Sequence, residues 1–296
     1  LHAVAEVSGL ARDPFVASSL LHAYLRLGTT GNARALFDGM PRPQRTVVGW
    51  SALVAAHAAR GDAEGAWRLL EEMRRDGGVE SNVITWNGLV SGLNRSGRAR
   101  DAVVALATMH GEGLLRPDAT GVSCALSAVG DVGLVSVGQQ LHGYAVKAGC
   151  RADACVVTAL IDMYGKCGQA AEVVRVFDES SHMDVASCNA LIAGLSRNAQ
   201  VCEALRLFKE FVDRGVELNV VSWTSIVACC VQNGKDLEAV EFFREMQAQG
   251  TEPNSVTIPC VLPAFANVAA LMHGRSAHCF ALRKGFLHDV YVSSAL

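Results

Sequence analysis

Residues 220–254 read VVSWTSIVACCVQNGKDLEAVEFFREMQAQGTEPN, and the spacing of their apolar residues predicts two helices. The spacing i, i+3, i+4, i+7 predicts one apolar stripe of a helix, formed here by Trp223, Ile226, Val227 and Cys230. Gly234 ends that helix, because glycine readily adopts the left-handed conformation at a helix end. A second apolar group follows at Ala239, Phe242, Phe243 and Met246. Pro253 keeps this second helix from resuming, so the segment is predicted to be a helix–turn–helix hairpin without a strand.

The same hairpin recurs with a period of about 35 residues, a length typical of helical-hairpin arrays. Val83–Asp118 and Val185–Asn219 align with 220–254 in one register. A longer period relates the segments that end at Asp13, Asp153 and Asp289, so that four unequal repeats form one larger unit. Neither helix of a hairpin can bury its stripe alone, and stability comes from stacking on the next hairpin. We therefore expect an all-α fold, a right-handed superhelical solenoid of stacked hairpins.

The whole chain, 1–296, is predicted to form a single array of repeats. Two kinds of unit depart from the ordinary one: some end in Gly-x-x-x-His-x-aromatic, and some are short and close on Phe-Asp. The predicted boundaries, with partial repeats at both ends, are 1–13, 14–46, 47–82, 83–118, 119–153, 154–184, 185–219, 220–254, 255–289 and 290–296. The chain begins at Leu1 without Met, in the middle of a repeat, so we expect a fragment from which a targeting peptide or further domain is missing.

Composition narrows the possible functions. Half of the residues are hydrophobic and 19% are charged, which argues against disorder. The formal net charge of −3 argues against a nucleic-acid binder that relies on bulk positive charge. Ten cysteines are scattered without a C-x-x-C pair, so we expect buried, reduced thiols and no metal site. No apolar run reaches the ~18–20 residues of a membrane span, and we expect no membrane partner.

The repeated wording resembles that of pentatricopeptide repeat (PPR) proteins. The hairpin length, Trp/Tyr-Asn-x-Leu-Ile, the mid-turn Gly, Phe-x-x-Met and the closing Pro-Asp or Pro-Asn match that family over essentially the whole chain. The mixture of ordinary, longer and short units resembles the plant "PLS" subclass. So do the stretches LIDMYGKCG at 160–168 and LHGYAVKAG at 141–149.

The resemblance implies a non-enzymatic protein that binds single-stranded RNA in plant mitochondria or chloroplasts, without a cofactor. Family members with such mixed units mostly select sites for cytidine-to-uridine RNA editing. We therefore expect a site-recognition factor for editing, with other editing-complex proteins as further partners. The alternative within the family is a factor for RNA stability, splicing or translation without an editing role. Any deaminase domain would lie beyond Leu296.

In the family, each repeat contacts one nucleotide through its fifth and its last residue. The fifth residues here are Ser18, Ser51, Asn87, Ser123, Thr158, Asn189, Thr224, Pro259 and Ser294. The last residues are Asp13, Thr46, Asn82, Asp118, Asp153, Asp184, Asn219, Asn254 and Asp289. The last residues precede helices, and helix capping alone would explain Asp, Asn and Thr there. The fifth residues lie inside a helix, where Ser, Thr and Asn are mediocre helix formers, and base recognition explains them better.

Hydrogen-bond chemistry relates these pairs to bases. Uracil and guanine present an N–H donor at the centre of the Watson–Crick edge, which suits the acceptor Asp, whereas cytosine and adenine present an acceptor, which suits the Asn amide. The resemblance adds that a fifth Asn goes with pyrimidines and a fifth Ser or Thr with purines. The implied readings are Ser51/Asn82 for adenine, Asn87/Asp118 for uracil, Thr158/Asp184 for guanine, Asn189/Asn219 for cytosine with some uracil, and Thr224/Asn254 for adenine.

The remaining pairs carry weaker expectations. Ser18/Thr46 favours a purine, and Ser123/Asp153 formally reads guanine in a longer unit, a type that reads less reliably. Pro259 has no polar side chain, so its pair with Asp289 is expected to be silent. Ser294 belongs to an incomplete repeat.

Two groups of apolar residues lie near the fifth position. Val48, Ile84 and Val221 are second residues on the same helix face, where they could sandwich bases, with packing against the next hairpin as the alternative. The tryptophans at 50, 86 and 223 open the apolar stripe, so we expect them in the core rather than against bases.

Two other classes of protein compete with an RNA binder. A protein-binding scaffold of the tetratricopeptide type shares the helical period, but it gives no reason for a column of Asn, Ser and Thr, and a titration with RNA separates the two. An enzyme is disfavoured, because His110-Gly111-Glu112 has the H-x-E form of a zinc deaminase while the accompanying P-C-x-x-C is absent from the sequence.

Overall fold

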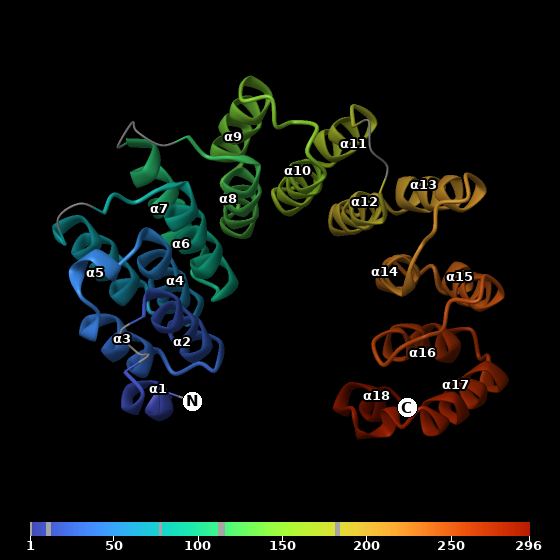
Figure 1. Ribbon diagram of the computed structural model, residues 1–296. Helices are drawn as coiled ribbons and strands as arrows, with labels where there is room; N and C mark the ends of the chain where they lie inside the picture. The colour runs from blue at the N-terminus through green and yellow to red at the C-terminus, as the bar shows by residue number, and fades with distance from the viewer. Residues whose placement is uncertain (1, 10–12, 77–78, 112–115, 181–183) are drawn as a thin grey trace. The chain divides into compact units, whose positions relative to one another are not determined.

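The computed structural model describes residues 2–9, 13–76, 79–111, 116–180 and 184–296. Within these ranges the chain forms helices, turns and connecting segments and no strand, which confirms the all-α prediction. It divides into two compact units, Leu1–Ala159 and Leu160–Leu296, and the boundary falls inside one helix, Ala154–Lys166. Figure 1 shows the helices of each unit following one another as hairpins in chain order.

The first unit is built from hairpins whose first helices lie side by side. Its helices are α1 (His2–Val7), α2 (Pro14–Arg26), α3 (Thr30–Gly39), α4 (Val47–Ala59), α5 (Ala63–Arg75), α6 (Val83–Arg95), α7 (Ala99–Gly111), α8 (Ala119–Val132), α9 (Val135–Lys147) and the start of α10 (Ala154–Lys166), with a short 3₁₀ turn η2 (Arg42–Gln44). Each first helix packs on its own second helix and on the next first helix, giving the series α2, α4, α6 and α8. This is the stacking that a stripe buried between hairpins requires.

The second unit repeats the arrangement. Its helices after α10 are α11 (Ala170–Asp178), α12 (Val185–Arg197), α13 (Val201–Asp213), α14 (Val220–Gln232), α15 (Asp236–Ala248), α16 (Thr257–Asn267), α17 (Leu271–Arg283) and α18 (Val290–Ala295), with a 3₁₀ turn η3 (Phe286–His288). Here α12, α14, α16 and α18 form the series of first helices in contact. A repeat array with these local contacts orients equivalent residues alike within a unit.

The tryptophans of the apolar stripe lie in the core, as predicted. Trp50, Trp86 and Trp223 are 2%, 0% and 2% exposed. Each meets an aromatic ring of a second helix edge-on: Trp50 meets Phe37 with ring centroids 4.8 Å apart, and Trp223 meets Phe208 at 5.0 Å. Because the rings are enclosed by neighbouring hairpins, they are not available to stack on a base.

Small residues allow the first helices to approach closely. In the first unit, a Cβ placed on Gly92 would lie 2.9 Å from the carbonyl oxygen of Ala55, so α6 rests on α4 with glycine at the contact. In the second unit, a Cβ on Gly165 would lie 2.7 Å from the Cα of Gly194, which brings the backbones of α10 and α12 together. The abundance of Ala and Gly in the sequence therefore has a packing cause.

One first helix departs from the pattern. The others begin at the first residue of the predicted repeat, as α14 does at Val220, whereas α16 begins at Thr257 rather than at 255. Pro259 lies in its first turn, where the missing N–H has no intrahelical partner to lose, but Pro263 lies in its interior. Pro263 therefore removes one backbone hydrogen bond from the interior of α16.

The turn inside each hairpin uses a left-handed residue. Glycine supplies it in most repeats, for example Gly97 at φ 77° and Gly234 at φ 69°, but Ala199 at φ 55° and Ala269 at φ 54° take its place in two hairpins. An L-residue there places its Cβ against the following carbonyl oxygen. The two alanine turns are therefore strained.

Replacing Ala199 with glycine is expected to raise the free energy of unfolding by about 1 kcal/mol, because the steric cost of positive φ is removed. The reverse change in the neighbouring hairpin, Gly234→Ala, should lower it by a similar amount and serves as the matched control. Urea denaturation followed by circular dichroism measures both. A loss of stability in Ala199→Gly would show that the turn carries no strain.

Candidate nucleic-acid interface

Each last residue of a repeat caps the helix that follows it. The side-chain oxygen accepts a backbone N–H of the next first turn: Asp118 Oδ1 lies 2.8 Å from the nitrogen of Gly121, and Asn82 Oδ1 lies 3.0 Å from that of Thr85. The same bond is made by Asp13, Thr46, Asp153, Asp184, Asn219, Asn254 and Asp289. The capping prediction is confirmed for the whole column.

Capping uses one side-chain atom and leaves the other available. A backbone N–H can pair only with an acceptor, so the caps Asn82, Asn219 and Asn254 must turn Oδ1 to the helix. Their Nδ2 donors make no hydrogen bond to any residue that the structure describes. In the same way Asp118 uses Oδ1 and keeps Oδ2 as an acceptor. Helix capping and base reading are thus compatible roles, with Asn offering a donor and Asp an acceptor.

The structure brings the predicted uracil pair into direct contact. Asn87 Nδ2 donates to Asp118 Oδ1 over 2.9 Å, although the two residues belong to the beginning and the end of one repeat. Asn87 is half-buried on α6, and Asp118 is exposed at the start of α8. One nucleotide base is therefore able to reach both side chains.

The predicted adenine pair of repeat 47–82 is joined through a third residue. Ser51 Oγ lies 2.7 Å from Thr85 Oγ1, and Thr85 Oγ1 lies 3.1 Å from Asn82 Oδ1. Thr85 also completes a capping box, because its hydroxyl accepts the N–H of Asn82. Ser51 is 7% exposed, so it is less accessible than its place in the fifth column suggested.

The predicted adenine pair of repeat 220–254 is joined in the same way. Thr224 Oγ1 lies 2.8 Å from Thr257 Oγ1, which donates to Asn254 Oδ1 over 2.9 Å. Thr257 is fully buried, like Thr85, whereas Thr224 is half-buried. The arrangement therefore recurs in both units.

The other fifth residues are not tied to a last residue by a hydrogen bond. Ser123, Thr158 and Ser294 donate to a carbonyl of their own helix, and Pro259 has no donor. Ser18 and Asn189 make no side-chain hydrogen bond to described residues. Thr158 and its predicted partner Asp184 belong to different units and are described separately. Base contact by these residues stays a prediction.

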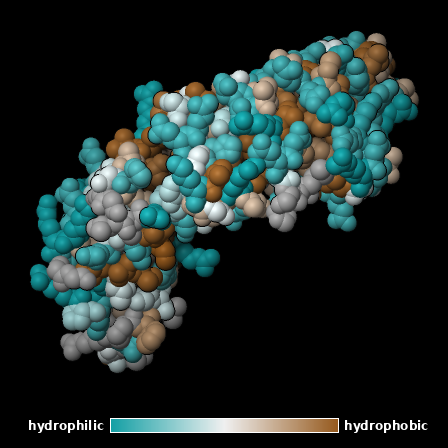
Figure 2. All heavy atoms as spheres, turned by 90° about the horizontal axis from the view of Figure 1, so that it is seen from above, coloured by the Kyte–Doolittle hydropathy of each residue, from teal (hydrophilic) through white to brown (hydrophobic). Residues whose placement is uncertain are grey.

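The apolar second residues are exposed. Val48, Ile84 and Val221 are 63%, 69% and 53% exposed, so packing against the next hairpin does not account for them. In Figure 2 hydrophobic and hydrophilic residues are interspersed over the face that is drawn. These second residues lie three positions from the fifth, on the same helix face, and base contact by them stays a prediction.

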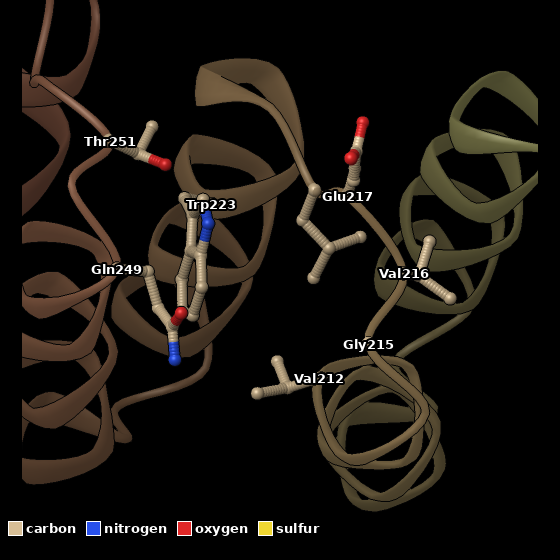
Figure 3. Close-up of a pocket in the computed structure, with 8 residues that line it drawn as sticks. Val212, Gly215, Val216, Glu217, Trp223, Gln249 and Thr251 are labelled. Carbon is tan, nitrogen blue, oxygen red and sulfur yellow. The ribbon is translucent and has the colours of Figure 1, made fainter.

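The hollow in Figure 3 has no catalytic set of side chains. It measures about 310 Å³ and lies beside the turn between α13 and α14, lined by Val212, Glu217, Trp223, Gln249 and Thr251. Glu217 is the one ionisable side chain among the described residues that line it. No described group of three His, Cys, Asp or Glu is placed to hold a metal ion, and Glu112 of the H-x-E triplet lies outside the described residues.

The cysteines are free thiols, but the expectation of burial is only partly correct. All ten are unpaired, and Cys188, Cys229 and Cys230 are buried. Burial raises the pKa of Cys188 to about 11 and that of Cys230 to about 12, so these thiols stay protonated near neutral pH. Cys155, Cys202 and Cys279 are exposed instead.

Among the residues that the structure describes, no helix is both long and apolar enough to cross a bilayer.

Comparison with known proteins identifies relatives for most of this chain. A family model described as "PPR repeat family" matches residues 45–95, 183–232 and 218–267, and one described as "PPR repeat" matches residues 84–114 and 155–184. The chain is 49% identical, over its whole length, to the pentatricopeptide repeat-containing protein At1g20230 of Arabidopsis thaliana, of which it covers 38%. It is 30% identical over 83% of its length to the chloroplastic relative At4g25270 of the same plant, of which it covers 39%.

Solved structures share the fold. The crystal structure of the pentatricopeptide repeat protein PPR10 from maize superposes with a TM-score of 0.67 at 24% identity, over 95% of this chain and 41% of that one. PPR10 in complex with an 18-nt psaJ RNA element gives a TM-score of 0.56 at 21% identity, over 99% of this chain and 47% of that one. The chain thus spans less than half the length of these relatives.

Proposed function

The chain belongs to the pentatricopeptide repeat family, and from that premise we propose that it binds single-stranded RNA with one base to each repeat. The observation that carries this proposal is the contact between Asn87 and Asp118, which gives one repeat a joined pair of polar groups facing a shared site. The relative PPR10 has been crystallised with an RNA element, and its fold is that of this chain.

Uracil recognition in repeat 83–118 follows from the hydrogen bonds already made. Asp118 Oδ1 is occupied by Gly121 and Asn87, so the uracil N3–H is received by Oδ2. Asn87 fills the space beside it that a purine would need. In the repeats that end in Asn82 and Asn254, the unpaired Nδ2 donates to the bare ring nitrogen of adenine instead.

The cellular role is RNA processing in chloroplasts or mitochondria. Several similar proteins of Arabidopsis thaliana carry the word chloroplastic in their names. The alternation of ordinary, longer and short units supports membership of the PLS subclass and recognition of cytidine-to-uridine editing sites, with other editing-complex proteins as partners. RNA stabilisation, splicing or translation without editing is the alternative use of the same binding surface.

A titration with RNA tests the proposal. The probe is the single-stranded RNA A-U-N-G-C-A, read 5′ to 3′ along repeats 47–82 to 220–254, with each of the four bases in turn at the second nucleotide. We expect the 296-residue chain to bind the strand with uracil at that nucleotide most tightly. A chain that binds none of the four strands would refute RNA binding and favour a protein-binding scaffold instead.

Salt dependence provides an independent expectation. Because the formal net charge is −3, binding should depend on base contacts and on sandwiching by Val48, Ile84 and Val221 rather than on phosphate neutralisation. The slope of log affinity against log salt should therefore be shallow, well short of that for the roughly 6–10 phosphate contacts of a strongly basic binder. Fluorescence anisotropy between low and moderate salt measures it. A steep slope without any base preference would contradict this expectation.

A further inference from the structure

The fifth and last residues of one repeat have a common neighbour, which is the third residue of the next repeat. Thr85 has this place for the pair Ser51 and Asn82, and Gly121 has it for the pair Asn87 and Asp118. The backbone N–H groups of Thr85 and Gly121 donate to the last residue, and the Thr85 hydroxyl also contacts the fifth residue Ser51. The third residue therefore influences both members of the pair.

Glycine at this place is what allows Asn87 to reach Asp118. A Cβ added to Gly121 would lie only 2.5 Å from Asn87 Oδ1 and 3.4 Å from its Cγ. A contact of 2.5 Å is too short for a carbon and an oxygen, so the amide of Asn87 would have to move away. That movement would displace the Asn87 Nδ2 that donates to Asp118 over 2.9 Å.

A threonine at this position contacts the hydroxyl group of a short fifth residue instead. Thr85 is fully buried, and its hydroxyl contacts Ser51 Oγ at 2.7 Å. Each hydroxyl has one proton, so two arrangements are possible. If Ser51 donates to the carbonyl oxygen of Val47, the Thr85 hydroxyl donates to Ser51. If Ser51 donates to Thr85 instead, the Thr85 hydroxyl donates to Asn82 Oδ1. In both cases Thr85 fixes the position of Ser51 relative to the cap. Thr257 does the same for Thr224 in the second unit.

We propose that the third residue of the following repeat is a positioning residue for base selectivity, in addition to the fifth and last residues. Gly121 leaves the space that the Asn/Asp pair of a uracil repeat requires, and Thr85 and Thr257 hold the hydroxyl of an adenine repeat at the distance that a purine requires. The inference rests on the proposed function. In the sequence, Thr85 and Thr257 follow the two adenine repeats and Gly121 follows the uracil repeat.

Gly121→Ala tests the inference in the uracil repeat. Alanine favours a helix more than glycine does, so the variant should remain folded while the amide of Asn87 is displaced. We expect the preference for uracil at the second nucleotide of A-U-N-G-C-A to fall by at least about fivefold, with base preference at the other nucleotides unchanged. The control is Gly143→Ala, the same change inside α9 at a glycine whose added Cβ would meet no atom within 4 Å.

Thr85 tests the inference in the adenine repeat, where two variants separate packing from positioning. Thr85→Val keeps the shape of the buried side chain and removes the hydroxyl, whereas Thr85→Ser keeps the hydroxyl. We expect valine to reduce the preference for adenine at the first nucleotide by at least about fivefold and serine to retain it. Equal loss in both variants would mean that Thr85 acts by packing alone, and the inference would be wrong.

The outcomes also distinguish this inference from the proposed function. A wild-type chain that does not rank the four bases at the second nucleotide refutes both. A wild-type chain that prefers uracil, together with Gly121→Ala that ranks the bases as the wild type does, leaves the proposed function standing and overturns the inference. Selective loss of the uracil preference in Gly121→Ala, with Gly143→Ala unchanged, supports it.

Discussion

Replacing Trp86 with alanine is expected to lower the free energy of unfolding by about 3–5 kcal/mol, the cost of deleting a large buried aromatic side chain. Trp86 is 0% exposed and meets Trp67 edge-on, with ring centroids 6.0 Å apart. Its removal leaves a cavity between the hairpins of α4 to α7 that the close-packed helices cannot fill. Urea denaturation of the two proteins measures the difference.

Ile84 is the matched control for Trp86, because it lies two residues earlier on the same helix and is 69% exposed. Ile84→Ala should change the free energy of unfolding by less than about 0.5 kcal/mol, as surface substitutions usually do. It should nevertheless weaken RNA binding, because Ile84 is proposed to sandwich a base. If Trp86→Ala keeps wild-type stability but binds RNA more weakly, Trp86 contacts RNA and does not belong to the core.

Replacing Asp118 with asparagine is expected to move repeat 83–118 from uracil towards cytosine. Asn caps a helix about as well as Asp, so Oδ1 keeps the N–H of Gly121 and the new Nδ2 stands where the acceptor Oδ2 stood. A donor at this point suits the bare ring nitrogen of cytosine. The ratio of the two affinities should change by roughly five- to more than a hundredfold, since a good base contact discriminates by ~1–3 kcal/mol.

Adding Asn87→Ser to Asp118→Asn is expected to move the same repeat towards adenine, because the pair becomes that of Ser51 and Asn82. Competition among the four A-U-N-G-C-A strands measures both variants. Asp13→Asn makes the same chemical change at a cap that ends the partial first repeat, so it should leave the ranking at the second nucleotide unchanged. If both test variants keep the wild-type ranking, Asn87 and Asp118 are only a surface residue and a helix cap.

The repeated elements could be predicted from the sequence because each is set by local rules. The stripe opened by Trp223 and the cap at Asn219 recur at one spacing, and α6, α12 and α14 begin directly after the caps that this spacing predicts. Asp and Asn caps are recognisable because their side chains bond a backbone only two or three residues away. Local chemistry of this kind leaves a pattern that a single sequence displays.

The remaining features depend on contacts between hairpins, which the sequence pattern does not display. Gly121 lies beside the bond from Asn87 to Asp118, where an added Cβ would be 2.5 Å from Asn87 Oδ1, and Ser51 contacts Thr85 of the next repeat. The left-handed conformation of Ala199 could not be predicted, because the repeat pattern places glycine in that turn. A comparison of the third residues of the repeats could have indicated the contacts of Asn87 and Ser51.

A structure of the 296-residue chain bound to A-U-G-G-C-A would show which atoms of each repeat touch a base, and it is the decisive test of base reading. The account predicts that the second base lies at repeat 83–118 with its N3–H within hydrogen-bonding distance of Asp118 Oδ2, while Oδ1 still caps α8 at Gly121. It also predicts that Ile84 and its counterparts contact base faces. An RNA strand bound elsewhere, or an Asp118 whose Oδ2 remains in solvent while the strand is held, would contradict it.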